Sequence, residues 1–255
     1  MIPAEHAGAI AGDALPLLVP FAQRFAVAPI SSFAVGAVAR GTSGSLYLGA
    51  NLEVVGVPLS FSVHAEQAAA TSAWLHGEEA LAAIAVSAAP CGYCRQFLQE
   101  LVSASTLEIV VDGEPPRLFA ELLPDAFGPR DLGVDAALMA PQDHGLRLDG
   151  DALVREALAA ANASYAPYTG GFGGVALQTA GGRVYTGRYA ENAAFNPSLA
   201  PLASALAMRA LGGDADDSIT RAALVEAAAP ISHAGATAQV LHALAPGVEL
   251  EAYAV

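Results

Sequence analysis

The sequence contains no lysine: its 11 basic residues are all arginines, set against 25 acidic residues, for a formal net charge of −14 at pH 7. Without lysine, the chain cannot form a Walker-type phosphate loop or a Schiff base with pyridoxal phosphate. A strongly acidic surface without a basic stripe repels the phosphates of polynucleotides. We therefore expect no nucleic-acid partner and an activity that depends on other groups.

Long apolar runs are also missing, although 54% of the residues are hydrophobic. Much of that fraction is alanine, and no window offers the roughly 18 uninterrupted apolar residues that a membrane-spanning helix needs. The first twenty residues lack the basic start of a secretory signal and contain Glu5 and Asp13. Together with only two cysteines, these features predict a cytoplasmic protein with no membrane partner.

The chain repeats itself at an offset of 138 positions. Three pairs of residues match at this offset without a gap, which indicates duplication of one unit. The pairs are Gly36 with Gly174, Gly49 with Gly187, and Glu53 with Glu191.

Each half of the sequence has the pattern of a β-hairpin followed by alternating helices and strands. In the first half we expect a helix over 66–75 and strands over 81–87 and 107–112. In the second half we expect helices near 198–211 and 235–244, with strands near 220–227 and 248–255. Such alternation predicts an α/β fold with covering helices. The predicted divisions are a short N-terminal helical segment 1–28, a catalytic domain 29–114, a linker 115–150 and a non-catalytic domain 151–255.

The only two cysteines, Cys91 and Cys94, lie within one helical turn after Pro90, and the motif His64-Ala-Glu66 lies upstream. A helix start favours thiolates, the form that zinc requires. Two thiolates and one imidazole make three ligands, which leaves the fourth position of a tetrahedral zinc open, as in catalytic sites. Glu66 is placed to carry protons beside such an ion.

Taken alone, neither motif is specific. A lone C-x-x-C is also typical of redox pairs and of half a zinc knuckle, and a lone H-x-E is common. The combination H-A-E, followed about 25 residues later by P-C-x-x-C, is the signature of zinc-dependent nucleobase deaminases. A redox pair would also leave His64 and Glu66 without a purpose, so the combination favours a catalytic zinc site.

From about Pro29 to the C-terminus the sequence resembles cytidine deaminases of the two-domain, homodimeric bacterial type. The resemblance implies two tandem three-layer αβα domains with mixed sheets, the second a degenerate copy. It also implies hydrolytic deamination of cytidine and 2′-deoxycytidine to uridine and 2′-deoxyuridine with release of ammonia, in pyrimidine salvage. The stretches that carry it are SSFAVGAVARG, GANLE, VHAEQAAA, AAPCGYCRQFLQEL, LPDAFGP, QDHG and YAENAAFNPSLAPL.

In the catalytic domain, the resemblance makes His64, Cys91 and Cys94 the ligands of one zinc ion per chain and Glu66 the proton shuttle. The second half lacks them: the offset of 138 places Leu202 opposite His64 and Ser204 opposite Glu66.

The resemblance also assigns substrate contacts. Asn51 and Glu53 would bind the ribose hydroxyls, Phe33 would pack against the pyrimidine, the Ala65 backbone would contact the base, and Phe127 would line the pocket. For each aromatic residue the alternative is packing in the hydrophobic core.

A second chain is part of the expected assembly. In the family, the second half of a partner subunit completes each active site, so the resemblance implies a homodimer in which Phe195 is an intersubunit contact. Two further functions stay open: deamination of a related or modified aminonucleoside, and non-catalytic nucleoside binding by a zinc-stabilised protein. A purely structural zinc site has no need of a shuttle carboxylate, so the presence of Glu66 argues against the non-catalytic alternative.

Overall fold

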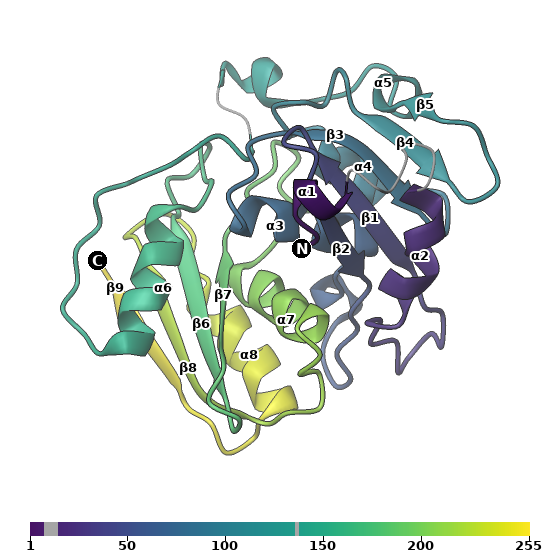
Figure 1. Cartoon of the computed structure of the whole chain (residues 1–255). Coiled ribbons are helices and arrows are strands. Elements are labelled where there is room, and N and C mark those ends of the chain that lie inside the picture. The colour runs from purple at the N-terminus through teal and green to yellow at the C-terminus, as the bar shows by residue number, and fades with distance from the viewer. Residues whose placement is uncertain (8–14, 136–137) are drawn as a thin grey trace. The chain divides into compact units, whose positions relative to one another are not determined.

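The computed structural model describes residues 1–7, 15–135 and 138–255 (Figure 1). Parts of the predicted N-terminal segment 1–28 and of the predicted linker 115–150 therefore lie outside the described residues. The chain divides into two compact units, and the domain bounds expected from the sequence stay a prediction. Unit 1 consists of Met1–Leu52, Val63–Ala140 and Asn192–Ser198; unit 2 consists of Glu53–Ser62, Pro141–Glu191 and Leu199–Val255.

Unit 1 contains a five-stranded sheet in the order β2-β1-β3-β4-β5. Only β3 and β4 run parallel, and the other neighbours are antiparallel, so the sheet is mixed. The stretch predicted as a linker contributes the edge strand β5, the helix α5 and the 3-10 helix η3. The strands are β1 (Gly36–Gly41), β2 (Leu46–Ala50), β3 (Leu81–Val86), β4 (Glu108–Val111) and β5 (Arg117–Leu118). The helices are α1 (Ala4–Ala7), α2 (Leu15–Gln23), α3 (Ala65–Leu75), α4 (Gly92–Leu98), α5 (Phe119–Leu122) and η3 (Pro129–Leu132).

Unit 2 contains a four-stranded mixed sheet in the order β7-β6-β8-β9, in which β8 and β9 are the parallel pair. The helices and strands expected from the sequence are confirmed within a few residues. The strands are β6 (Gly173–Thr179), β7 (Val184–Arg188), β8 (Ile219–Glu226) and β9 (Leu250–Ala254). The helices are α6 (Ala152–Asn162), α7 (Pro201–Leu211), α8 (Ala234–Leu244) and the 3-10 helix η2 (Leu59–Phe61).

Helices cover both faces of each sheet, which confirms the α/β fold with two mixed sheets. In unit 1, buried residues of α2 such as Val19 pack on Val38 of β1. Gly49 of β2 pairs with Ala37, on the opposite face from Val38, and contacts α3. Unit 2 repeats the arrangement, with α6 on one face and α7 against Gly187 on the other.

The glycines shared by the two halves mark the points where helix backbone approaches strand backbone most closely. A Cβ atom added to Gly49 would lie 2.2 Å from the Ala65 carbonyl oxygen of α3. At Gly187 it would lie 2.1 Å from the Pro201 carbonyl oxygen of α7. No real Cβ contact is that short, so only glycine permits this packing. The repeated glycines in the sequence are therefore a packing requirement.

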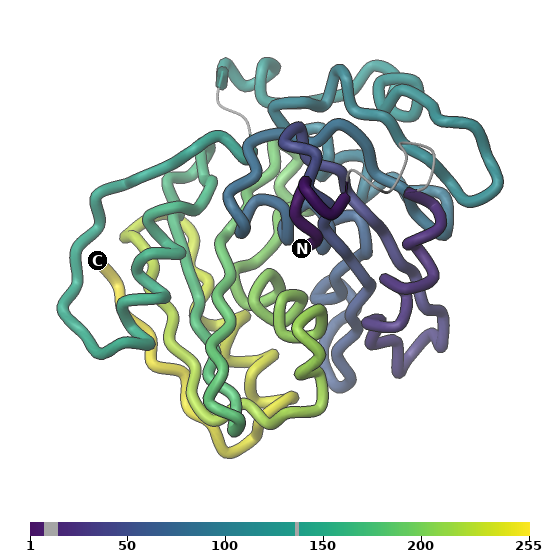
Figure 2. Tube along the Cα trace, viewed as in Figure 1, coloured from purple at the N-terminus to yellow at the C-terminus, as the bar shows by residue number. Residues whose placement is uncertain are grey.

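Each unit also includes a short segment from the other half of the sequence. Residues 192–198, between β7 and α7, belong to unit 1, and residues 53–62, between β2 and α3, belong to unit 2. The two segments occupy equivalent places in the repeat. The continuous trace in Figure 2 therefore leaves and re-enters each unit.

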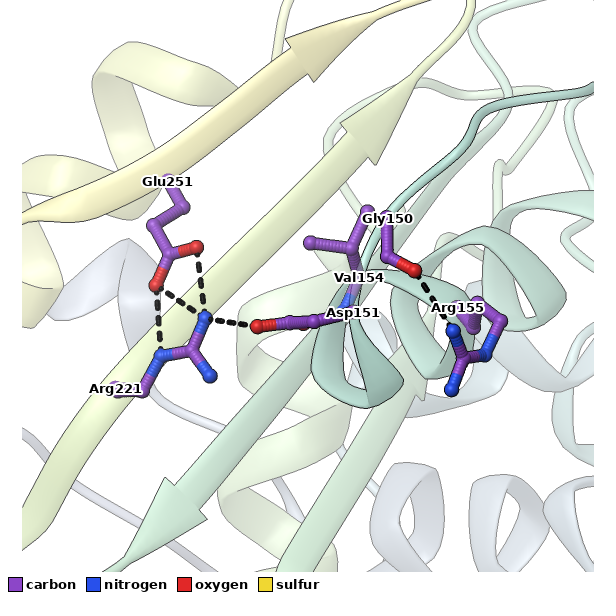
Figure 3. Close-up of polar contacts among 6 residues, drawn as sticks. All are labelled: Gly150, Asp151, Val154, Arg155, Arg221 and Glu251. Carbon is purple, nitrogen blue, oxygen red and sulfur yellow. Dashed lines mark hydrogen bonds and ion pairs between the residues drawn. The ribbon is translucent and has the colours of Figure 1, made fainter.

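An ion network joins three elements of unit 2 (Figure 3). Arg221 of β8 forms a two-pronged contact with Glu251 of β9, with both nitrogen–oxygen distances at 2.9 Å. The same guanidinium donates to Asp151, the N-cap residue of α6, at 2.8 Å. Asp151 also accepts from the Val154 backbone N–H and so caps the helix. The start of α6 is thus tied to the β8–β9 edge.

Within the described residues, no helix has both the length and the apolar character needed to cross a bilayer.

We predict that Gly49→Ala destabilises the protein by about 1–3 kcal/mol, because the new methyl group forces α3 away from β2. The free energy of unfolding is measured by urea denaturation followed by circular dichroism. Gly235→Ala is the control: a Cβ there meets nothing within 4 Å, and alanine favours the helix α8. Equal stability of the two variants would contradict the packing argument.

Candidate active site

Three side chains from two helix starts converge in unit 1. His64 is the N-cap residue of α3, Cys91 is the N-cap residue of α4, and Cys94 lies one turn into α4. The His64 Nδ1 atom lies 3.5 Å from the Cys91 sulfur and 3.2 Å from the Cys94 sulfur. The two sulfurs are 3.7 Å apart, too far for a disulfide, and both thiols are free. No disulfide therefore joins the two cysteines.

These distances fit a single tetrahedral zinc. Bonds of about 2.3 Å to sulfur and about 2.0 Å to nitrogen at tetrahedral angles place sulfur and nitrogen about 3.5 Å apart, and two sulfurs about 3.8 Å apart. The three ligand atoms meet this requirement, and they are the group of possible metal ligands among the described residues. The donor set has three members, so the fourth position of the ion is left for a small ligand.

The environment of the two thiols matters for binding an ion. Burial raises the pKa of the Cys94 thiol above its usual range, and the nearby Glu66 and Cys91 side chains raise it further. A cation that accepts the sulfur as a ligand provides the compensating positive charge. The pocket is therefore suited to a thiolate only in the presence of a bound cation.

Glu66 lies in the first turn of α3, beside the ligands, and only 4% of its surface is exposed. Burial raises the pKa of its carboxyl group, while its own backbone, the Cys94 side chain and His64 oppose that shift. A carboxyl group with a raised pKa exchanges protons readily near neutral pH. The structure thus brings together the four residues that the motifs predicted.

Asn51 holds the segment that carries Phe33. Its side-chain oxygen accepts a hydrogen bond from the Val35 backbone N–H at 2.8 Å, and its amide nitrogen donates to the Phe33 carbonyl at 3.0 Å. The Phe33 side chain itself is 61% exposed, so the core-packing alternative is wrong for this residue. Ala65 is buried as the first residue of α3. Glu53 belongs to unit 2, and its role beside Asn51 stays a prediction.

Phe127 and Phe195 are also on the surface, with 44% and 60% of the side chain exposed, which again excludes core packing. The resemblance assigned Phe195 to a partner subunit. Within the single chain, residues 192–198 belong to unit 1, and the contact of Phe195 with a partner subunit stays a prediction. Hydrogen bonds from α3 and α4 hold this segment in unit 1, such as that from the Tyr93 hydroxyl to the Asn196 carbonyl at 2.7 Å.

Sequence reasoning missed the residues that support the ligands. Gln67 accepts a hydrogen bond from the His64 backbone N–H at 3.2 Å and so fixes the start of α3. The Tyr93 ring lies 5.7 Å from the His64 ring, centroid to centroid. A glutamine at the third helical position is a known capping residue, but histidine is not a usual partner in that pattern. Tyr93 carried no signal beyond its place between the two cysteines.

Comparison with known proteins identifies the family. Two family profiles, both described as the cytidine and deoxycytidylate deaminase zinc-binding region, match residues 14–109 and 119–238. A cytidine deaminase from Vibrio vulnificus (strain YJ016) is 51% identical over 91% of this chain and 79% of its own length. One from Yersinia pestis (strain Pestoides F) is 54% identical over 84% of this chain and 74% of its own. This chain belongs to the cytidine deaminase family.

A solved cytidine deaminase from Mycobacterium tuberculosis covers 47% of this chain and 98% of its own, at 35% identity and a TM-score of 0.42. Family membership confirms the resemblance noted in the sequence, and the profile over 14–109 confirms that the His64–Cys91–Cys94 cluster lies in a zinc-binding region of cytidine deaminases.

Unit 2 keeps the family framework without its zinc ligands. The ungapped offset had placed Leu202 and Ser204 opposite His64 and Glu66, and this register is wrong. The contacts of Gly187 align Pro201 with Ala65, because the segment before α7 is two residues shorter than the segment before α3. The N-cap residue Ala200 therefore stands opposite His64.

By the same comparison of helix starts, Leu202 stands opposite Glu66, His233 opposite Cys91, and Ala236 opposite Cys94. Ala200, Leu202 and Ala236 line an apolar hollow of about 20 Å³, closed in part by Phe61. His233 is buried, and its ring nitrogen Nε2 is bonded to the Gly171 carbonyl at 3.0 Å. Side chains of this kind cannot bind zinc together.

We predict one zinc ion per chain, lost in Cys91→Ala and in His64→Ala, because two remaining ligands hold the ion too weakly. Zinc is measured by atomic emission on protein purified without chelators. His242→Ala, which removes an exposed imidazole from α8, is the control and keeps its metal. Two zinc ions per chain would contradict the loss of the ligands in unit 2.

Proposed function

We propose that the protein is a cytidine deaminase, which hydrolyses cytidine and 2′-deoxycytidine to uridine and 2′-deoxyuridine and releases ammonia. The observation that carries the proposal is the buried Glu66 beside three ligand atoms spaced for one zinc. Family membership and relatives named cytidine deaminase support the same activity.

Glu66 performs the proton transfers in this reaction. The zinc ion, when bound, supplies an acidified water as the nucleophile at C4 of the base. Glu66 accepts a proton from that water and delivers it to N3, which prepares C4 for attack. It then takes the remaining proton of that water from the new C4 hydroxyl and delivers it to the amino group, because amide ion is a very poor leaving group and ammonia is a good one. Water and cytidine thereby become uridine and ammonia, with no other reactant.

Contacts outside the metal centre would select the nucleoside. Asn51 and Glu53 would bind the ribose hydroxyls, while Phe33 and the Ala65 backbone would contact the base. Phe127 and Phe195 would complete the pocket, and their large exposed surface is consistent with contact to a ligand. A chain without lysine, with Glu53 beside the sugar, favours nucleosides over nucleotides.

A related or modified aminonucleoside is the second candidate substrate, because the same proton transfers serve any amino group on a similar ring. A non-catalytic, zinc-stabilised nucleoside-binding protein is a weaker alternative. Such a protein would have no use for a buried carboxyl group with a raised pKa beside the three metal ligands. Two free thiols also suit the reducing cytoplasm, which we propose as the location.

We predict that Glu66→Gln retains one zinc per chain and loses deaminase activity by about 10²- to 10⁴-fold in kcat, because the amide cannot carry protons. Activity is followed by the absorbance change of cytidine and by ammonia release. Glu78→Gln is the control, since Glu78 is a buried carboxylate of the same unit that bonds Ser43 and Tyr47 instead. An active Glu66→Gln variant would reject the mechanism.

We predict a homodimer, as the resemblance implies, with exposed apolar side chains such as Leu17, Val55 and Leu59 offering surface for a second copy. Light scattering coupled to size exclusion should give twice the chain mass of 25.7 kDa. A monomeric yet fully active protein would show that one chain forms the whole site.

A further inference from the structure

The segment 192–198 reaches unit 1 from the second half of the sequence and is hydrogen-bonded at four of its residues. The contacts come from α3, from α4 and from Glu100, which follows α4. The Asn192 side chain donates to the Gln96 carbonyl at 2.8 Å. Three more are the Ala193 N–H to the Glu100 carboxylate at 2.7 Å, the Tyr93 hydroxyl to the Asn196 carbonyl at 2.7 Å, and the Gln67 amide to the Pro197 carbonyl at 3.5 Å.

Among these hydrogen-bonding residues, Glu100 loses the most hydration free energy on folding, because its carboxylate is fully buried. A buried carboxylate is tolerated only where its oxygens have hydrogen-bond donors. One of those donors is the Ala193 backbone N–H, two residues before Phe195. Glu100 follows the end of α4, and Cys91 and Cys94 lie at the start of the same helix. Through this hydrogen bond, the Glu100 carboxylate fixes the segment 192–198 relative to α4, the helix at whose start the two cysteines lie.

Tyr93 anchors the segment on the other side of Phe195. Its hydroxyl donates to the carbonyl of Asn196, the residue that follows Phe195, and its ring lies beside the His64 ring. Tyr93 stands between the two cysteines in the sequence. One side chain therefore contacts both a predicted metal ligand and the segment from the second half.

Phe195 itself has a backbone that is held in an unfavourable conformation. Its φ angle is +61°, a region that residues with a Cβ atom rarely adopt. Its side chain is mostly exposed, so no burial in the core compensates for this conformation. Strain of this kind persists only where the surroundings impose it, and it is concentrated at functional sites. The anchors on either side of Phe195 supply that constraint.

We propose that Tyr93 and Glu100 are positioning residues that hold Phe195 in place for the nucleoside before the substrate arrives. The proposal rests on the proposed function, because it takes the nucleoside as the ligand that Phe195 meets. Tyr93 and Glu100 do not act on the reacting atoms. They act through Phe195, so their effect on nucleoside affinity requires the phenylalanine ring.

A double-mutant cycle tests this dependence. Tyr93→Phe keeps the ring and removes only the hydroxyl, and Tyr185→Phe is a matched control that removes another 2.7 Å hydroxyl contact, to Asp214 in unit 2. Cytidine affinity is measured by calorimetry in the zinc-loaded Glu66→Gln background, where binding occurs without turnover. Zinc content is determined for every variant, so that loss of metal is recognised.

We expect Tyr93→Phe to weaken cytidine binding about 2- to 10-fold with zinc retained, the size of effect that one hydrogen bond gives. The same substitution should have no effect once Phe195 is replaced by alanine. Tyr185→Phe should leave affinity unchanged. In the active enzyme, Tyr93→Phe should raise KM more than it lowers kcat.

Glu100 is tested by rescue and by hydrogen exchange. Glu100→Gln retains an acceptor oxygen for the Ala193 N–H and should bind cytidine nearly as well as the parent protein, whereas Glu100→Leu should not. Exchange of the backbone amides over 192–198, measured by mass spectrometry without substrate, should be faster in Tyr93→Phe and Glu100→Leu and unchanged in Tyr185→Phe. This measurement does not depend on turnover or on nucleoside binding.

Two results would overturn the proposal while leaving the deaminase activity established. One is an equal loss of affinity from Tyr93→Phe with and without the Phe195 ring, and the other is unchanged hydrogen exchange over 192–198. A parent protein that neither binds nor deaminates cytidine would overturn the proposed function, and the nucleoside role of Phe195 with it.

Discussion

The close approach of α3 to the sheet at Gly49 is the contact on which the metal centre depends. His64 is far from Cys91 in the sequence, and yet its Nδ1 atom must lie within bonding range of the ion that both sulfurs contact. The start of α3 reaches that position because nothing larger than a hydrogen atom separates Gly49 from the Ala65 carbonyl. Gln67 then fixes the His64 backbone at the helix start. Ligand geometry is therefore a consequence of helix–strand packing.

Comparison of the two units shows which structural features are kept when the zinc ligands and the proton shuttle are absent. Unit 2 keeps the glycine at the helix–strand contact, the mixed sheet and the helix starts, while Ala200, Leu202 and Ala236 replace two ligands and the shuttle with apolar groups. A buried imidazole, His233, stands at the remaining ligand position and is bonded to a backbone carbonyl. The loop between β7 and α7 places Phe195 in unit 1. The second half of the sequence thus contributes residues to both units.

Much of the site could be predicted from the sequence because its determinants are local. Cys91 and Cys94 are one helical turn apart, and His64 and Glu66 are two positions apart, so each motif specifies a helix start and the chemistry at it. The helices and strands followed from periodicity for the same reason. The helix α2 is the counterpart of α6 and belongs to the repeat. The sequence Gly-Asp-Ala-Leu that begins at Gly12 recurs at Gly150, again at an offset of 138, so the sequence contained a signal for this pair that sequence reasoning missed.

The exchange of segments between the halves could not be predicted, since it depends on contacts between residues about 100 positions apart, such as Glu100 with Ala193. The alignment of Leu202 and Ser204 with His64 and Glu66 was wrong for a related reason. The segment before α7 is two residues shorter than the segment before α3, so the strands of the two halves keep the offset of 138 while α7 is offset from α3 by 136. No residue pattern in that segment indicates where the two residues are missing. In both cases the deciding information lies in tertiary packing.

The charges of the site explain why a glutamate can serve as the shuttle here. A divalent cation bound by two thiolates and a neutral imidazole has no net formal charge, so it does not force the nearby carboxyl group to stay ionised. Burial is the largest influence on the pKa of the Glu66 carboxyl group and raises it. The ligand set and the burial of Glu66 together place the carboxyl group where it can both accept and give up a proton near neutral pH.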